Sequence, residues 1–241
     1  MRNELRQGQR MSSLLSCVFL ASMTLPVFLA AQSQEMSERV AEVKEAVARN
    51  KQALAQYTWV EQVTISLKGE QKKQEHFQVR LGPDGKQQKQ SLDPPPEAPK
   101  HEGRLKKHIV EKKKEEYKEY ADQIKALIQQ YVPPAGDMLE QAYQKGNIMV
   151  GPQPGGSGQY RLVISNYIKQ GDNMTLIVDK TAKELSSLSI STYLDDPKDA
   201  VNVTVAFARI PDGPNHVSGE TINGVSKQLT VAIQNSNYQH L

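Results

Sequence analysis

The feature that most constrains the fold is a series of short segments in the second half of the chain in which apolar and polar residues alternate. Five segments show this alternation and are rich in β-branched residues: QYRLVISNYI, NMTLIVD, ELSSLSISTYL, AVNVTVAFARI and KQLTVAIQNSNY. A period of two places half of the side chains on each face of a strand. Short turns join the segments, and strands joined by short turns run antiparallel. We therefore predict an antiparallel sheet with one apolar and one polar face.

The first half of the chain adds strands of the same kind. Residues 57–69, YTWVEQVTISLKG, contain the only Trp and alternate almost without a break. Residues 57–92 as a whole predict an antiparallel meander, with Phe77 on the apolar side of its second strand. The sequence GPDGK at residues 82–86 favours a turn, because Pro presets φ, Asp bonds its own backbone and Gly accepts positive φ.

One carboxylate interrupts the apolar side of the first strand. Trp59, Val63 and Ile65 fall on that side, and Glu61 lies between them. A buried carboxylate without a partner costs several kcal/mol. We interpret Glu61 either as a strand end or a member of a local ion pair, or as a group at the rim of a cavity.

Three further stretches predict helices: residues 37–56, about 104–132 and 135–146. The proline-rich sequence DPPPEAPK, residues 93–100, is predicted to be a stiff extended linker before the long helix. The apolar stripe of the long helix consists of Val110, Tyr117, Ala121, Ile124, Ile128 and Tyr131. Because its first half is mostly charged, we expect the stripe to pack on the sheet only from Ile124 onwards, while residues 112–116 stay in water.

These elements predict an α+β fold in a single domain, residues 34–241, with the helical and linker segment 93–158 inserted between two groups of strands. A sheet of seven or eight strands curls, so we expect a half-barrel with an N-terminal helix and a mid-chain helical lid. A curled sheet under a lid can enclose an apolar cavity. We expect Val201 to face the same interior and Glu61 to lie near the mouth of the cavity. The side chains predicted to line the cavity are Trp59, Glu61, Val63, Ile65, Phe77, Val203, Val205 and Phe207.

The N-terminus has the three parts of a secretory signal peptide. Three arginines within the first ten residues precede an uncharged apolar run, residues 12–31, which ends in small residues. This order is typical of a cleaved signal. We predict that residues 1–33 are the signal peptide, with cleavage after Ala31 or after Ser33.

Export predicts a location in the periplasm of a bacterium or outside the cell. Cys17 is the only cysteine and lies within the signal, and exported domains without disulfides are common in the periplasm. Translation starts at Met1 or Met11. Two alternatives are a retained membrane anchor and a lipoprotein, since LLSC weakly resembles a lipobox. We expect no transmembrane segment after signal cleavage.

Charge and motif spacing argue against several function classes. The net charge of +3 belongs mostly to the first 33 residues, so it gives no reason to expect a nucleic-acid partner. The five histidines show none of the spacings of zinc sites, and the Gly-rich residues 151–159 lack the Lys-Ser/Thr of a phosphate-binding loop. The acidic DDPKD sequence at residues 195–199 reads as an ordinary turn. We therefore predict no enzyme, no cofactor, no metal and a monomeric state.

The layout of the chain resembles the LolA/LppX-like superfamily. Residues 50–71, NKQALAQYTWVEQVTISLKGEQ, are similar to the family's passage from a helix into a strand, and residues 176–191, LIVDKTAKELSSLSIS, to its central strand-turn-strand unit. The resemblance covers residues 37–238. A strand of the Arg-Pro-x-x-Phe type is absent and the mid-chain helix is longer and more charged, so no binding residues of the family are carried over. The resemblance implies a periplasmic carrier or sensor built on a half-open barrel with a helical lid.

Two hypotheses about function follow. The first is that the protein binds a lipid-like or other apolar ligand, or a lipidated protein, in the half-barrel. The alternative is a non-enzymatic periplasmic interaction module whose sheet is filled by its own helices.

Overall fold

The computed structural model describes residues 41, 45, 48–94, 104–132, 136–156 and 158–241, with the backbone alone at 104–110, 136 and 137. The chain divides into two compact units, residues 1–44 and 45–241, and the second is the unit described below. The expected signal peptide, its cleavage sites and both candidate start sites lie outside the described residues. Of the expected N-terminal helix, residues 41, 45 and 48–54 are described and are helical.

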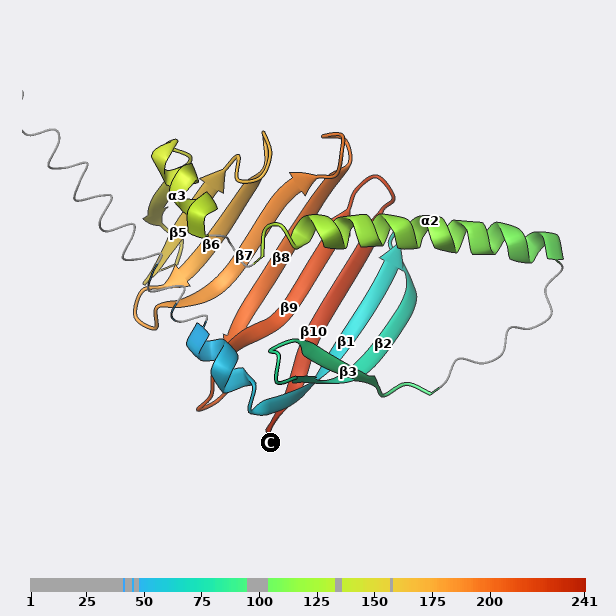
Figure 1. Ribbon diagram of the computed structural model, residues 1–241, viewed down its shortest axis with the longest axis horizontal. Helices are drawn as coiled ribbons and strands as arrows, with labels where there is room; N and C mark the ends of the chain where they lie inside the picture. The colour runs from blue at the N-terminus through green and yellow to red at the C-terminus, as the bar shows by residue number, and fades with distance from the viewer. Residues whose placement is uncertain (1–40, 42–44, 46–47, 95–103, 133–135, 157) are drawn as a thin grey trace, which may run out of the picture. The chain divides into compact units, whose positions relative to one another are not determined.

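The described residues form ten antiparallel strands in one open, curved sheet (Figure 1). The order across the sheet is β3-β2-β1-β10-β9-β8-β7-β6-β5-β4. The expected α+β fold with a single antiparallel sheet is confirmed. The strands are β1 (Tyr57–Leu67), β2 (Glu70–Leu81), β3 (Gln87–Ser91), β4 (Ile148–Pro152), β5 (Gln159–Ser165), β6 (Asn173–Asp179), β7 (Glu184–Tyr193), β8 (Ala200–Arg209), β9 (Asn215–Gly224) and β10 (Leu229–His240).

The expected number of seven or eight strands is too low, because the sequence prediction misses β4 and β9. β4 is five residues long and contains Gly151 and Pro152, two residue types that are uncommon within strands. β9, NHVSGETING, has two glycines and few apolar residues, so its alternation is weak. Backbone pairing with strongly alternating neighbours forms both strands: β5 pairs with β4, and β8 and β10 flank β9.

One long connection carries the chain from one edge of the sheet to the other. β3 and β4 are the two edge strands, and the segment between them includes α2 (Arg104–Ile128) and α3 (Gly136–Gln144). α3 ends as the sequence predicts. Gly146 has a φ of 70°, and the amide of Asn147 donates to the carbonyl of Ala142 at 2.8 Å, a pattern that closes a helix at its C-terminus.

α2 packs on the sheet through its second half. Tyr120 and Ile124 are buried, and both lie against Gly224 of β9. A Cβ atom at Gly224 would come within 2.6 to 2.8 Å of atoms of these two side chains, so the close approach of the helix requires glycine at this position.

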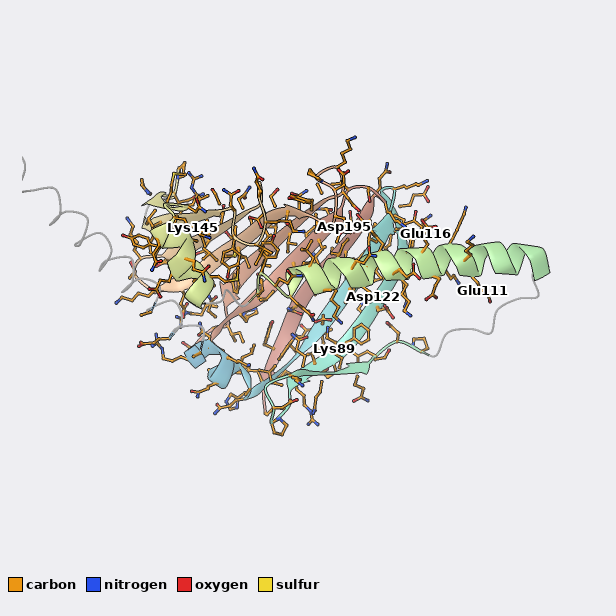
Figure 2. All side chains as sticks on the ribbon, turned by 45° about the horizontal axis from the view of Figure 1, so that its top comes forward. Lys89, Glu111, Glu116, Asp122, Lys145 and Asp195 are labelled. Atoms are coloured by element: carbon orange, nitrogen blue, oxygen red, sulfur yellow. The ribbon has the colours of Figure 1, made fainter. Side chains whose placement is uncertain are left out.

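The charged stretch at residues 111–116 of α2 stays in water, as expected. Residues 111–116 are all exposed, and Figure 2 shows Glu111 and Glu116 on this part of the helix. The buried face differs in part from the expected stripe, because Tyr120 and Leu127 are buried while Ile128 is only half-buried. The stripe and the observed face share Ile124 and Tyr131. The side chain of Val110 is not among the described ones.

Candidate functional site

Strand register brings the expected ligand-binding residues to one face of the sheet, which we call the inner face. Glu61 pairs with Phe77 across β1 and β2, and Trp59 precedes Glu61 by two residues on the same side. Two rows of directly paired residues cross from β8 to β1. They consist of Val203, Ile222, Val231 and Ile65 in one row, and Val205, Glu220, Ile233 and Val63 in the next.

The prediction for β8 is confirmed by this register. Val201, Val203 and Val205 are buried and face the same side as Trp59 and Val63. Phe207 continues the alternation of β8 beyond a register irregularity between Ala206 and Phe207, and it is half-buried. Residues far apart in the sequence therefore share one surface, as the single-sheet prediction requires.

The inner face divides into a covered part and a partly open part. On β5 to β8 most of its side chains are buried, and Figure 1 shows α3 beside β5 and β6. On β1, β9 and β10 Leu229 is buried, but most of the aliphatic side chains are only half-buried. We call these residues the apolar strip: Val63, Ile65, Ile222, Val231 and Ile233.

Two buried tyrosines fasten the helical connection to the sheet. The hydroxyl of Tyr131, at the end of α2, donates to Asp172 at 2.6 Å and lies 2.7 Å from the Thr192 hydroxyl. The Asp172 carboxylate is buried and also accepts backbone N–H groups of residues 167–169. Burial and the Asp172 contact raise the pKa of Tyr131. Each of these polar groups has a hydrogen-bond partner within the cluster, so we assign the cluster a structural role.

The second fastening point lies at the other end of the packed half of α2. The Tyr120 hydroxyl donates to Asp199 at 2.8 Å and accepts from the Ser226 hydroxyl at 3.1 Å. Lys227 forms an ion pair with Glu116 at 2.7 Å. The acidic sequence at residues 195–199 is therefore a turn that binds a helix, in agreement with its interpretation as an ordinary turn.

Glu61 is the buried carboxylate that the sequence singles out. It is 2% exposed and forms an ion pair with Lys89 of β3. The lysine side chain passes over Phe77, with its ammonium 5.9 Å from the ring centroid, and Figure 2 labels it beside the sheet. The interpretation as a local ion pair is confirmed. The expectation of a hydrated carboxylate is wrong, because Glu61 is almost fully buried and Lys89 neutralises its charge.

Trp59 is buried in an aromatic cluster next to this ion pair. It is 2% exposed, and its ring stacks on Tyr238 with centroids 5.7 Å apart. The Tyr238 ring in turn lies 4.1 Å from that of His216. Burial lowers the pKa of His216, which favours the neutral ring, whereas burial and the charge of Glu61 raise the pKa of Tyr238. The indole N–H of Trp59 has no hydrogen-bond partner among the described residues.

Glu220 is the functional candidate that sequence reasoning misses. It lies in the middle of β9, between Val205 and Ile233 in the same row of the inner face. Burial, and then the negative charge of Glu61, raise the pKa of its carboxyl, which Lys89 offsets in part. The signal for it in the sequence is its two-residue spacing from Ile222, which becomes visible once β9 is known to be a strand.

Other kinds of site receive no support from the described part of the chain. Among its residues, no group of three or more His, Cys, Asp or Glu is placed to hold a metal ion. None of its helices combines the length and the apolar character that a membrane span requires. Comparisons of the chain with protein-family models, with curated proteins and with solved structures find no match.

Proposed function

We propose that this protein is an exported, non-enzymatic binding protein that holds an apolar, lipid-like ligand on the inner face of its sheet. The observation that carries the proposal is the apolar strip. Its five aliphatic side chains lie side by side on three adjacent strands and remain half-buried, whereas the same face on β5 to β8 is mostly buried. Contiguous apolar surface that stays open to solvent is typical of a binding surface. The ligand is a free lipid or the lipid group of a lipidated protein.

The position of α2 favours this proposal over a sheet filled by its own helices. The second half of the helix packs at Gly224, near one end of β9. Residues 111–116 of the helix are exposed and highly charged, so these side chains do not fill the apolar strip. The signal peptide expected at residues 1–33 and the resemblance to periplasmic carriers support export and the same class of ligand.

Organic extraction of the purified protein, followed by mass spectrometry, tests the proposal directly. We expect a lipid-like molecule to be recovered in a constant ratio to protein. A fluorescence titration with dodecanol complements this test, because Trp59 is the only Trp and borders the inner face. If no lipid is recovered and the folded protein does not bind dodecanol, the proposal is contradicted and the interaction module is favoured.

Substitutions at two neighbouring residues test whether the ligand binds on the inner face of the sheet. Ile65 belongs to the apolar strip, whereas Thr64 points to the opposite face of the same strand. Ile65→Gln should weaken dodecanol binding about tenfold, since burying an aliphatic side chain contributes about 1.5–3 kcal/mol. Thr64→Gln, the matched control, should leave the affinity unchanged.

A further inference from the structure

The charges on the inner face do not balance around Glu220. Two charged groups act on its carboxylate: Glu61 disfavours the ionised form and Lys89 favours it. Lys89, however, already forms an ion pair with Glu61. On β2, Lys73 and Glu75 likewise pair with each other, at 2.7 Å. Glu220 itself has no hydrogen-bond or ion-pair partner among the described residues, so its negative charge is compensated only in part, by the lysine that already pairs with Glu61.

A second acceptor without a donor lies on the neighbouring strand β10, diagonally across from Glu220. Asn235 is two residues along β10 from Ile233, which pairs with Glu220. The Nδ2 atom of Asn235 donates to the carbonyl of Val217 at 2.9 Å. This bond fixes the orientation of the amide, because a flipped amide would place two oxygens against each other. The Oδ1 atom is buried and has no partner within the described part of the chain.

The strand neighbours of Glu220 are apolar, whereas Asn235 pairs with Glu61 across β10 and β1. Val205 and Ile233 flank Glu220 in its row, and Ile222 follows it along β9. A half-buried carboxylate between aliphatic side chains is unfavourable unless a cation or a hydrogen-bond donor meets it. A protonated amine supplies both, since an ammonium group carries a positive charge and three donors.

We propose that Glu220, with Asn235 Oδ1, binds the protonated amine of a lipid-like ligand whose hydrocarbon chain lies on the apolar strip. This assignment rests on the proposed function and specifies its ligand class. The ammonium group forms a charge-assisted hydrogen bond with the Glu220 carboxylate and donates a second bond to Asn235. The same carboxylate repels the headgroup of a fatty acid, so the site discriminates against anionic amphiphiles.

Three single-chain probes of equal length test the inference: dodecylamine, dodecanol and dodecanoate. The amine is protonated at pH 7.5, because alkyl amines of the lysine type have pKa values near 10.4. Isothermal titration calorimetry below the micelle concentrations gives each affinity. We expect dodecylamine to bind about tenfold or more tightly than dodecanol, since hydrogen bonds to charged groups are the stronger ones, and dodecanoate to bind weakest.

Glu220→Gln removes the charge and keeps the shape of the side chain. It should reduce the preference for the amine over the alcohol to less than about threefold and leave the affinity for dodecanol within about twofold of its original value. Asn235→Leu should also weaken the binding of dodecylamine more than the binding of dodecanol. Glu119→Gln, in the exposed part of α2, is the matched control and should preserve the preference. Circular dichroism before titration establishes that each variant is folded.

The outcomes separate this inference from the proposed function. If dodecanol binds but dodecylamine binds no more tightly, or if Glu220→Gln retains the preference, the amine site is overturned while the apolar ligand stands. If dodecanoate binds as well as the amine, the amine site is also overturned. If none of the three probes binds to the folded protein, the proposed function fails, and the amine site fails with it.

Discussion

At the scale of single residues, the inner face combines apolar packing with charges whose partners come from other strands. Glu61 on β1 is neutralised by Lys89 on β3, which reaches across β2. Removing one partner of a buried ion pair leaves the other charge uncompensated in a low-dielectric environment. Lys89→Met should therefore destabilise the fold by about 3–5 kcal/mol in urea denaturation.

Two comparisons control the Lys89 prediction. Lys86→Met, in an exposed turn, should change the free energy of unfolding by less than about 0.5 kcal/mol. Combining Glu61→Gln with Lys89→Met removes both charges and should recover most of the lost stability. Equal stability of Lys89→Met and the original protein would show that the ion pair does not support the fold.

Removing the charge of Glu220 should stabilise the folded protein at neutral pH, whereas removing that of Lys89 destabilises it. Its pKa is raised in the folded protein above the ordinary value of 4.5, first by burial and then by Glu61, with Lys89 opposing. The folded state thus holds this proton more tightly than the unfolded state does. The resulting stabilisation is present below pH 4.5 and is lost as the pH rises through the folded pKa. Glu220→Gln, which cannot titrate, should become more stable relative to the original protein between pH 4 and pH 7.

Thermal melts of both proteins across this pH range test the prediction. A constant difference in melting temperature between pH 4 and pH 7 would show that the Glu220 carboxyl titrates as it does in the unfolded chain. Glu119→Gln provides the reference for an exposed glutamate, and its difference from the original protein should not change over the same range.

At the scale of elements, the docking of α2 depends on one glycine. Gly224→Ala would place a Cβ atom 2.6 to 2.8 Å from Tyr120 and Ile124, and overpacking of this kind costs about 1–3 kcal/mol. Hydrogen exchange should become faster in residues 120–128 and change little in residues 111–116, which are already exposed. Gly219→Ala is the matched control on the same strand, because its nearest contact would be an ordinary 3.6 Å. Equal effects of the two substitutions would contradict the proposed contact.

The same elements show what the sequence can and cannot predict. Alternation alone predicts β1, β5, β6, β7, β8 and β10, because each strand has one strongly apolar side. β4 and β9 carry little alternation and exist through backbone pairing with their neighbours, which no local pattern records. For α2, the sequence predicts Ile124 and Tyr131 but not Tyr120 and Leu127, because the contact with Gly224 decides which face turns inward. The chemistry of Glu61 and Glu220 likewise depends on residues brought close only by the completed sheet.

At the scale of the whole molecule, the helical connection between the two edge strands explains why one part of the inner face is covered and another is not. The connection is fastened at Tyr131 and at Tyr120, and both points bind turns or strands between β5 and β10. The exposed first half of α2 contributes no buried side chain at residues 111–116. The apolar strip on β1, β9 and β10 is therefore left half-buried.

Occupation of this strip should stabilise the entire sheet. A ligand that binds only the folded state adds RT ln(1 + [L]/Kd) to the free energy of unfolding, which is about 2.7 kcal/mol at a hundredfold excess over Kd. We expect dodecylamine at a hundredfold excess over Kd to raise the free energy of unfolding of the original protein by this amount, seen as a higher urea midpoint. The midpoint of Ile65→Gln should rise less at the same concentration. Thr64→Gln should respond like the original protein. An unchanged midpoint, with the folded state intact, would contradict ligand binding on the inner face, because no ligand can bind the folded state alone without shifting the folding equilibrium.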